Sequence, residues 1–202
     1  MIVNENLTIY LHSLERDGPD WLEKIRGQAV DCGVPIIRRE MESFLRVLLL
    51  TTRPKRILEI GTGVGYSALF MESCLESGSI VTIENDAPRL EAARKNLRDH
   101  DRILLVEEDA RKALEQMEDS FDFIFLDAAK AQYLTMLPDI LRIMKPGSLL
   151  LADNVLQEGS LVQSRFITPR RQRTIHSRMR DFLWEIKHHP QLETSVITIG
   201  DG

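Results

Sequence analysis

The sequence predicts an α/β protein: a doubly wound, Rossmann-like and mostly parallel sheet with helices on both faces and a helical extension at its N-terminus. Three observations support this prediction. From residue 56 onward, short apolar runs alternate with segments long enough for helices. Most runs are apolar throughout, which is typical of strands buried on both faces of a parallel sheet. Residues 1–55, by contrast, read as helices.

The individual elements follow in chain order. Pro19 and Asp20 open a stretch of helical periodicity that stops at Gly33, and a second runs from about Arg39 to Leu50. The predicted strands are 56–60, 80–84, 103–106, 121–127 and 148–153. The helices predicted between them are 66–76, 88–100, 110–118 and 130–144. In such a fold, ligands bind at the carboxyl ends of the strands.

In the C-terminal part, the residue pattern predicts a long helix at 170–189 and a strand at 194–199. The closing Gly200-Asp201-Gly202 is typical of a hairpin turn. We therefore expect a C-terminal antiparallel hairpin whose last strand is missing from this sequence. The whole of 1–202 is predicted to be one domain, with the helical extension at 1–55 and the sheet with its covering helices at 56–202.

Composition limits the function. The net charge of -5 argues against a protein that coats nucleic acid or an anionic membrane, although a local basic patch stays possible. The two cysteines, Cys32 and Cys74, lack metal-ligand spacing and indicate a reducing compartment. No signal peptide or membrane-spanning run is visible. We expect a soluble, cytoplasmic protein.

A glycine-rich turn follows the first strand, with Gly61, Gly63 and Gly65 in G-x-G-x-G spacing. A dinucleotide-binding turn has G-x-G-x-x-G spacing instead. Glu59, just before the turn, would repel a pyrophosphate but suits a cationic methionine group. These features favour S-adenosylmethionine over a nicotinamide dinucleotide, and a purely structural turn is the alternative.

The next two strands also end in polar residues. Glu84 ends the second strand, where a carboxylate accepts hydrogen bonds from ribose hydroxyls in many nucleoside sites. Asp109-Ala110 follows the third strand, where a side chain can contact adenine. Glu84 has a structural alternative as a helix-start acid, and Asp109 is also a good helix N-cap. Three such signals at successive strand ends favour a nucleoside cofactor.

The fourth and fifth strands end in Asp127 and in Asp153-Asn154. Neighbouring strands lie roughly 4.8 Å apart, so these side chains would meet at one sheet edge. Two carboxylates and an amide oxygen suit Mg²⁺ or Ca²⁺ rather than zinc. Two separate helix caps are the alternative. Lys130, three residues after Asp127, is either a base beside the cation or a solvated lysine.

Three motifs together resemble the metal-dependent, catechol-type O-methyltransferase family: Leu58–Ser67, Asp127–Tyr133 and Asp153–Leu156. The resemblance covers nearly the whole chain. Further segments are similar to the bacterial tRNA 5-hydroxyuridine methyltransferases, namely Gly33–Ile36, Gly159, Pro169–Arg171, His189-Pro190 and Gly200–Gly202. The missing last strand is the one departure.

The resemblance implies roles by position. Asp127, Asp153 and Asn154 match metal ligands, and Lys130 matches the catalytic base. The cofactor positions are Ile37, Glu59, Gly61, Ser67, Glu84, Asp109, Ala110 and Asp127. It also implies Mg²⁺ or a similar divalent cation, S-adenosylmethionine and a homodimer. The cation lowers the pKa of a substrate hydroxyl, and the oxygen then attacks the sulfonium methyl in line.

The prediction of the substrate depends on a basic stretch that contains no acidic residue. Its arginines are Arg165, Arg170, Arg171, Arg173, Arg178 and Arg180. It is either a solvated face or a surface for a phosphate backbone. With the resemblance, the leading prediction is methylation of 5-hydroxyuridine at the tRNA wobble position to 5-methoxyuridine, and a small catechol-like substrate is the alternative. N-methylation is disfavoured because no Asn/Asp-Pro-Pro-Tyr motif follows the fourth strand. A non-enzymatic binding module has little use for Lys130 beside such a set of oxygen ligands.

Overall fold

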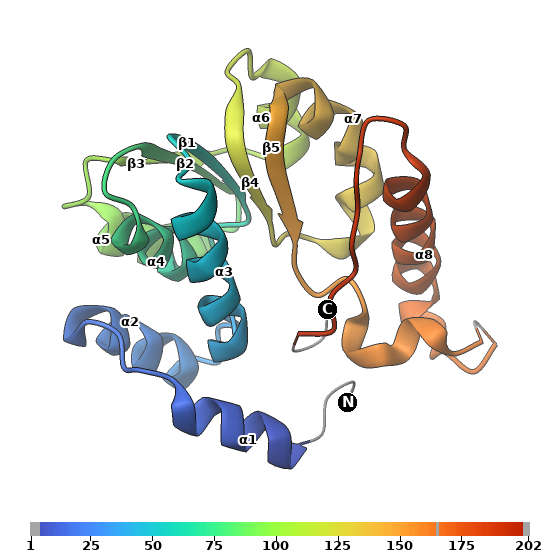
Figure 1. The fold of residues 1–202 in the computed structure, drawn as a ribbon, viewed down its shortest axis with the longest axis horizontal. Helices are drawn as coiled ribbons and strands as arrows, with labels where there is room; N and C mark the ends of the chain where they lie inside the picture. Colours follow the sequence, from blue (N-terminus) through green and yellow to red (C-terminus); the bar gives the residue numbers. More distant parts are fainter. Residues whose placement is uncertain (1–4, 165, 200–202) are drawn as a thin grey trace.

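The computed structural model describes residues 5–164 and 166–199. Three helices precede the sheet (Figure 1), and they are α1 (Glu5–Leu14), α2 (Asp20–Asp31) and α3 (Arg39–Thr52). α2 begins after Pro19, and α3 is followed by Arg53, which adopts a left-handed conformation (φ 47°) and caps the helix. The α2 and α3 residues Leu22, Leu45 and Leu49 are buried, so these helices are part of the packed molecule.

Five parallel strands form one sheet in the order β3-β2-β1-β4-β5. The strands are β1 (Arg56–Ile60), β2 (Ser79–Glu84), β3 (Ile103–Glu107), β4 (Phe121–Leu126) and β5 (Met144–Ala152). β1 is central: Ile57 pairs with Ile80 of β2 on one side and with Phe123 of β4 on the other. The predicted doubly wound parallel sheet is confirmed, and β4 and β5 are neighbours, as the predicted cation site requires.

Helices cover both faces of the sheet (Figure 1). They are α4 (Tyr66–Cys74), α5 (Ala87–Leu97), α6 (Ala110–Gln116), α7 (Tyr133–Ile143) and α8 (Arg173–His188), with short 3-10 helices η1 (Lys130–Gln132), η2 (Gln157–Val162) and η3 (Arg170–Gln172). Side chains alternate between two hydrophobic cores along each strand. Leu58 and Ile60 pack with α6, α7 and α8, whereas Ile57 packs with the α2–α5 side.

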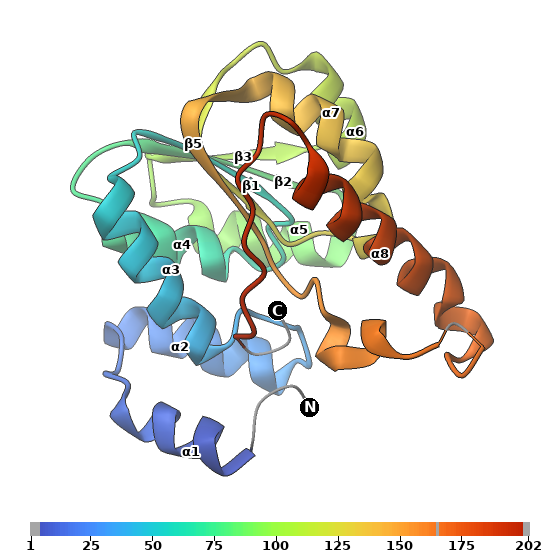
Figure 2. The same cartoon turned by 45° about the vertical axis from the view of Figure 1, so that its right-hand side comes forward.

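The predicted C-terminal strand is wrong. Residues 194–199 form no strand, and all strand pairings in the described part of the chain are parallel. The segment runs beside β5 (Figure 2) and lines with it an apolar groove of about 710 Å³. The Thr194 hydroxyl donates to the Ile186 carbonyl (2.6 Å), and Lys187 Nζ donates to the Thr194 carbonyl (2.5 Å). Thr194 is thus held by α8 rather than by a ladder on β5. The predicted turn at 200–202 lies outside the described residues.

Two further observations concern the chain as a whole. Cys32 and Cys74 are both free thiols. A search of residues 5–164 and 166–199 finds no helix with the length and apolar character needed to cross a membrane.

Candidate active site

A cavity of about 650 Å³ opens at the carboxyl ends of the strands. Its wall contains ten of the eleven predicted site residues: Ile37, Gly61, Ser67, Glu84, Asp109, Ala110, Asp127, Lys130, Asp153 and Asn154. Glu59 is the exception. The structure therefore brings together side chains from the end of every strand and from the loop before α3, as expected at the topological switch of a doubly wound sheet.

The glycine-rich turn forms the floor between β1 and α4. All three glycines have positive φ (105°, 55° and 87° for Gly61, Gly63 and Gly65), a region in which other residues are strained. Gly61 is required for a second reason, because a Cβ there would overlap the backbone carbonyl of Asp127. The turn thus packs directly against the end of β4.

Glu84 is a rigid carboxylate in the wall. It is buried, and it accepts hydrogen bonds from the backbone N–H groups of Gly63 (2.9 Å), Asn85 (3.0 Å) and Asp86 (3.0 Å). These donors fix the carboxylate without using all of its acceptor positions, so it can also accept from a ligand hydroxyl.

Asp109 has the predicted N-cap role. Its Oδ1 accepts from the backbone N–H of Arg111 (3.1 Å) and Lys112 (3.4 Å) at the start of α6. The same residue lines the cavity, so the capping role and a ligand contact are compatible.

Lys130 and Asp127 form the polar centre of the other half of the cavity. Lys130 Nζ donates to Asp127 Oδ1 (2.8 Å) and to the Tyr133 hydroxyl (3.0 Å). The fully buried Tyr133 donates its own proton to a backbone carbonyl, that of Leu126 (3.0 Å) or Asp153 (3.2 Å). Its lone pair therefore faces Lys130, and the tyrosine orients the amine toward the ends of β4 and β5.

Asp153 and Asn154 complete this half. Asp153 is buried, and its Oδ1 accepts from the Asn154 N–H (2.7 Å). Asn154 is left-handed (φ 56°), a conformation that asparagine tolerates better than most residues. No three His, Cys, Asp or Glu side chains in the described ranges form a group that could hold a metal. Asp127, Asp153 and Asn154 nevertheless share one cavity wall and offer two carboxylates and an amide oxygen, a donor set that fits a hard cation.

Glu59 lies behind the cavity wall and is fully buried. Burial raises its pKa to about 8, and the negative charges of Asp127 and Glu84 add to this shift, whereas the hydroxyls of Ser67 and Thr82 oppose it. Its Oε2 accepts from the Thr82 hydroxyl (2.5 Å), while Oε1 has no hydrogen-bond partner. Glu59 does not line the cavity itself, and its role as a cofactor residue stays a prediction.

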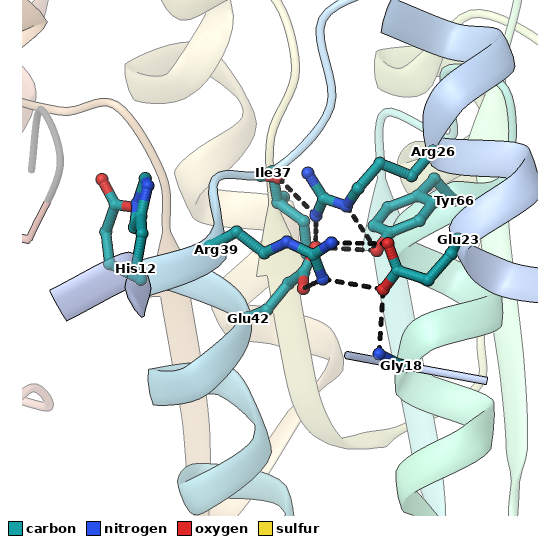
Figure 3. Close-up of polar contacts among 9 residues, drawn as sticks. His12, Gly18, Glu23, Arg26, Ile37, Arg39, Glu42 and Tyr66 are labelled. Atoms are coloured by element: carbon teal, nitrogen blue, oxygen red, sulfur yellow. Dashed lines mark hydrogen bonds and ion pairs between the residues drawn. The ribbon is translucent and has the colours of Figure 1, made fainter. Parts of the chain in front are cut away.

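A network of ion pairs supports the wall from the side of the N-terminal helices (Figure 3). Arg26 of α2 pairs with Glu42 of α3, and Arg26 Nε donates to the hydroxyl of Tyr66 (3.0 Å), a residue of the cavity wall. Arg26 Nη2 also donates to the Ile37 carbonyl (3.3 Å). The network thus holds the loop before α3 against the start of α4. Sequence reasoning missed it because charges on separate helices carry no signal of their pairing.

The cavity also includes Arg38, which the sequence analysis did not identify. Arg38 Nη2 forms an ion pair with Glu158 Oε1 of η2 (3.2 Å). This exposed pair connects the loop before α3 with the segment after β5.

The structure divides the basic stretch into two groups. Three arginines bond to backbone carbonyls: Arg173 to Thr168 (3.0 Å) and Phe166 (3.2 Å), Arg178 to Ala131 (3.0 Å) and Arg180 to Leu161 (3.4 Å). Arg170 and Arg171 are exposed at η3. Arg165 lies outside the described residues. Arg173 and Arg180 hold the segment after β5 in place, and Arg178 connects α8 to η1, whereas the second group is exposed to solvent.

Comparisons with known proteins agree on one family. The family model of O-methyltransferases matches residues 15–202. Tapetum-specific methyltransferase 1 of Arabidopsis thaliana is 31% identical over 87% of this chain and 78% of its own length. Catechol O-methyltransferase of Niastella koreensis is 30% identical over 82% of this chain and 79% of its own length.

A solved structure extends this agreement to three dimensions. The O-methyltransferase from Bacillus cereus, in complex with S-adenosylhomocysteine, superposes with a TM-score of 0.84 at 26% identity. The match covers 97% of this chain and 92% of that one. The chain therefore belongs to the O-methyltransferase family, as an S-adenosylmethionine-dependent enzyme of the caffeoyl-CoA and catechol type.

Proposed function

We propose that the enzyme methylates one hydroxyl of a vicinal oxygen pair held by a divalent cation, and that its substrate is 5-hydroxyuridine at the wobble position of tRNA. The observation that carries the reaction class is the Lys130–Asp127 pair, which shares one cavity with Asp153 and Asn154 and with the ends of β1, β2 and β3.

In this proposal the cofactor lies along the ends of β1 to β3. Glu84 accepts from the ribose hydroxyls, and Asp109 with Ala110 borders the adenine. The wall formed by Ile37, Gly61 and Ser67 receives the methionine end, which brings the sulfonium methyl toward Asp127. The fixed carboxylate of Glu84 supports this placement, because its three backbone donors leave no freedom to turn away.

Lys130 accepts the proton of the reacting hydroxyl. Its amine is oriented by Tyr133 and lies 2.8 Å from Asp127 Oδ1. Asp127, Asp153 and Asn154 would hold the cation, and this ion, when bound, would lower the pKa of the substrate hydroxyl. With its proton on Lys130, the substrate oxygen would bond to the methyl carbon as the carbon–sulfur bond breaks, which would leave S-adenosylhomocysteine.

The exposed residues after β5 support tRNA as the substrate. Arg170 and Arg171 are exposed, and so are two large apolar side chains a few residues earlier in the same segment, Phe166 (86% exposed) and Ile167 (74% exposed). Cations next to an exposed aromatic ring are the combination that binds single-stranded nucleic acid, because phosphates pair with arginine and bases stack on rings. The anticodon loop offers such an unpaired base.

A small catechol-like substrate is the second candidate. It is favoured by the relative from Niastella koreensis, whose name states catechol O-methylation. Catechol and 5-hydroxyuridine both present two adjacent oxygens, so the same residues would serve either substrate.

The reaction is tested by chelation and by substitution at Lys130. Excess chelator should abolish methyl transfer and Mg²⁺ should restore it, while full activity in chelator would contradict a role for the cation. Lys130→Ala should lower kcat by about 10²–10⁴-fold, the usual contribution of a general base. Lys130→Arg should not rescue the rate, because guanidinium stays protonated.

The salt dependence of binding distinguishes the two candidate substrates. Phosphate contacts release counterions, so the binding constant for tRNA falls as salt rises. Replacing Arg170 and Arg171 by Ala should reduce the slope of the logarithm of this constant against the logarithm of salt concentration by about 0.7–0.9 per lost contact. The matched control is Lys95→Ala with Arg98→Ala. These two exposed cations lie in the last turn of α5 and directly after it, and α5 packs on β3 at the opposite edge of the sheet. Unchanged binding and methylation of hydroxylated tRNA in the first variant would favour the small molecule.

A further inference from the structure

The carboxyl group of Glu59 has an unusual environment for a buried acid. Its side chain is 0% exposed, and Oε1 has no hydrogen-bond partner. Its nearest charged influences are two other carboxylates, Asp127 and Glu84, and in the described part of the chain no cation pairs with it. An unpaired ionised carboxylate in such a place is strongly disfavoured.

Two hydroxyl groups in series connect Glu59 to the cavity. Glu59 Oε2 lies 2.5 Å from the hydroxyl of Thr82, which lies 2.6 Å from the hydroxyl of Thr62. Thr82 is 0% exposed and Thr62 is 2% exposed, and Thr62 is part of the cavity wall. We call Glu59, Thr82 and Thr62 the hydroxyl relay.

The direction of the relay depends on the charge of Glu59, because each hydroxyl has one proton to donate. When Glu59 is ionised, Thr82 donates to Glu59 and must accept from Thr62. Thr62 then donates its proton to Thr82, and its oxygen keeps a lone pair that can accept from a group in the cavity. The relay in this state accepts a hydrogen bond from a ligand.

When Glu59 is neutral, its proton belongs on Oε2. A proton on Oε1 would be a buried donor without an acceptor, whereas an unsatisfied carbonyl oxygen costs less. The carboxyl then donates to Thr82, Thr82 donates to Thr62, and Thr62 directs its proton away from Thr82. The relay in this state has lost its acceptor.

The empty site favours the neutral state. Burial raises the pKa of Glu59 to about 8, and Asp127 and Glu84 act in the same direction. A cation with N–H groups beside Thr62 reverses this preference in two ways. Its charge stabilises the carboxylate, and its hydrogen bond requires the acceptor that only the ionised relay provides.

We propose that the hydroxyl relay couples cofactor binding to proton release: the α-ammonium group of the cofactor's methionine moiety binds at Thr62, and Glu59 loses its proton to solvent as the ligand binds. The proton on Glu59 Oε2 leaves to the buffer, the relay reverses, and no covalent bond changes. Glu59 is thereby a positioning residue that acts through Thr82 and Thr62. This inference rests on the proposed placement of the cofactor.

The test is calorimetric binding of S-adenosylhomocysteine at pH 6.5 in several buffers of different ionisation enthalpy. At this pH the ligand amine is protonated and Glu59 is neutral. A chelator is present, so that no metal ion contributes protons. The slope of the measured enthalpy against buffer ionisation enthalpy should show close to one proton released per site, and the dissociation constant should fall nearly tenfold from pH 6 to pH 7.

Two controls isolate the relay. In the unchanged protein, 5′-methylthioadenosine, which lacks the ammonium and carboxylate groups, should bind without releasing a proton. In Glu59→Gln, a substitution of the same shape, S-adenosylhomocysteine should bind with no release. Thr82→Val should reduce the release well below that of the parent, because the ionised carboxylate loses its donor.

The outcomes separate the relay from the cofactor placement. Equal release by both ligands, or undiminished release from Glu59→Gln, overturns the relay while the placement stands. Glu84→Ala tests the placement: if it leaves the affinity of all ligands unchanged, the placement and the relay are both overturned. Release by the amino-acid ligand alone, lost in Glu59→Gln, establishes the relay.

Discussion

Glu42 and Glu59 are both buried carboxylates, on either side of the cavity wall, and their surroundings are opposite. Glu42 pairs with Arg26 and lies 3.5 Å from Arg39 Nη1, and it accepts from the Tyr66 hydroxyl (2.8 Å). Glu59 has only hydroxyl groups and two neighbouring carboxylates. The charge of Glu42 is compensated by its partners, as a structural role requires, because an unpaired buried ion is strongly destabilising. The uncompensated carboxylate is the one placed behind the ligand cavity, where a bound cation can supply the missing charge.

The largest effect is expected when Glu42 is made to resemble Glu59. Arg26→Met removes the nearer of the two guanidinium groups beside Glu42 and leaves only Arg39, 3.5 Å away, while it keeps most of the side-chain volume. It should lower the free energy of unfolding by about 3 kcal/mol in urea titrations. The double variant Arg26→Met with Glu42→Leu should recover most of this loss, because no unpaired charge remains. A double variant less stable than the single one would contradict the view that Glu42 is held by its charge partners.

The second prediction concerns the pH dependence of stability in the ligand-free protein. The folded pKa of Glu59, about 8, lies above the unfolded value of 4.5, so the folded state holds its proton longer than the unfolded chain. Its contribution to stability is greatest below pH 4.5 and is lost as pH rises through 8. Glu59→Gln removes this loss. As pH rises from 5 to 8, the free energy of unfolding of the variant should therefore increase relative to that of the parent by on the order of 3 kcal/mol.

The matched control for this profile is Glu42→Gln. It leaves Arg26 and Arg39 without their shared carboxylate, so it should destabilise the protein at both pH values rather than gain with rising pH. Urea titrations at pH 5, 6.5 and 8 would distinguish the two variants. Parallel stability profiles for Glu59→Gln and the parent would show that Glu59 is ionised in the empty protein.

The surroundings of Glu84 are intermediate between those of Glu42 and Glu59, because its buried carboxylate accepts hydrogen bonds from three backbone N–H groups. Glu84→Ala should weaken binding of S-adenosylmethionine by about 1–3 kcal/mol, the scale of hydrogen bonds to a charged group. Calorimetry measures this directly. The hydroxyl relay should still release a proton in this variant, but less than in the parent, because loss of the Glu84 charge lowers the pKa of Glu59 in the ligand-free protein.

The smallest effects are expected in the basic stretch, where paired and exposed charges lie on one short segment. Arg173→Ala should lower the free energy of unfolding by about 1 kcal/mol, because it removes hydrogen bonds to the carbonyls of Phe166 and Thr168. Arg170→Ala with Arg171→Ala should change it by less than about 0.5 kcal/mol, as is usual for exposed positions. A larger loss of stability in the Arg170 and Arg171 variant than in Arg173→Ala would mean that the exposed arginines stabilise η3.

The residues of the cavity wall were predictable because strand ends in a parallel sheet meet at one edge. Asp127, Asp153 and Glu84 each follow an apolar run, so their order in the sequence places them together. Thr82 could not be found in this way, since it sits inside a buried strand and has no signal of its own. The pairing of Arg26 with Glu42 depends on how two helices pack, which periodicity does not give.

The C-terminal strand shows the opposite failure. Alternation at 194–199 favours a strand with one buried face, but residues 195–198 are all exposed, because alternation does not state which partner a segment meets. The segment lies beside β5 without forming a ladder, and Thr194 bonds to α8 instead. The predicted substrate, cation and homodimer stay predictions, because they concern molecules that a single chain does not contain.

The strand order also sets the sequence in which the two halves of the site can be assembled during synthesis. β1 pairs with β2, which follows closely, and with β4, which begins at Phe121. Closing the β1–β4 ladder brings together distant parts of the chain, which makes it a slow, non-local step. A nascent chain that has emerged through α6 already carries Glu84, Asp109 and the glycine-rich turn. Asp127, Lys130 and Asp153 follow only later, so all the strand-end residues of the nucleoside-binding half are synthesised before any residue of the reacting half.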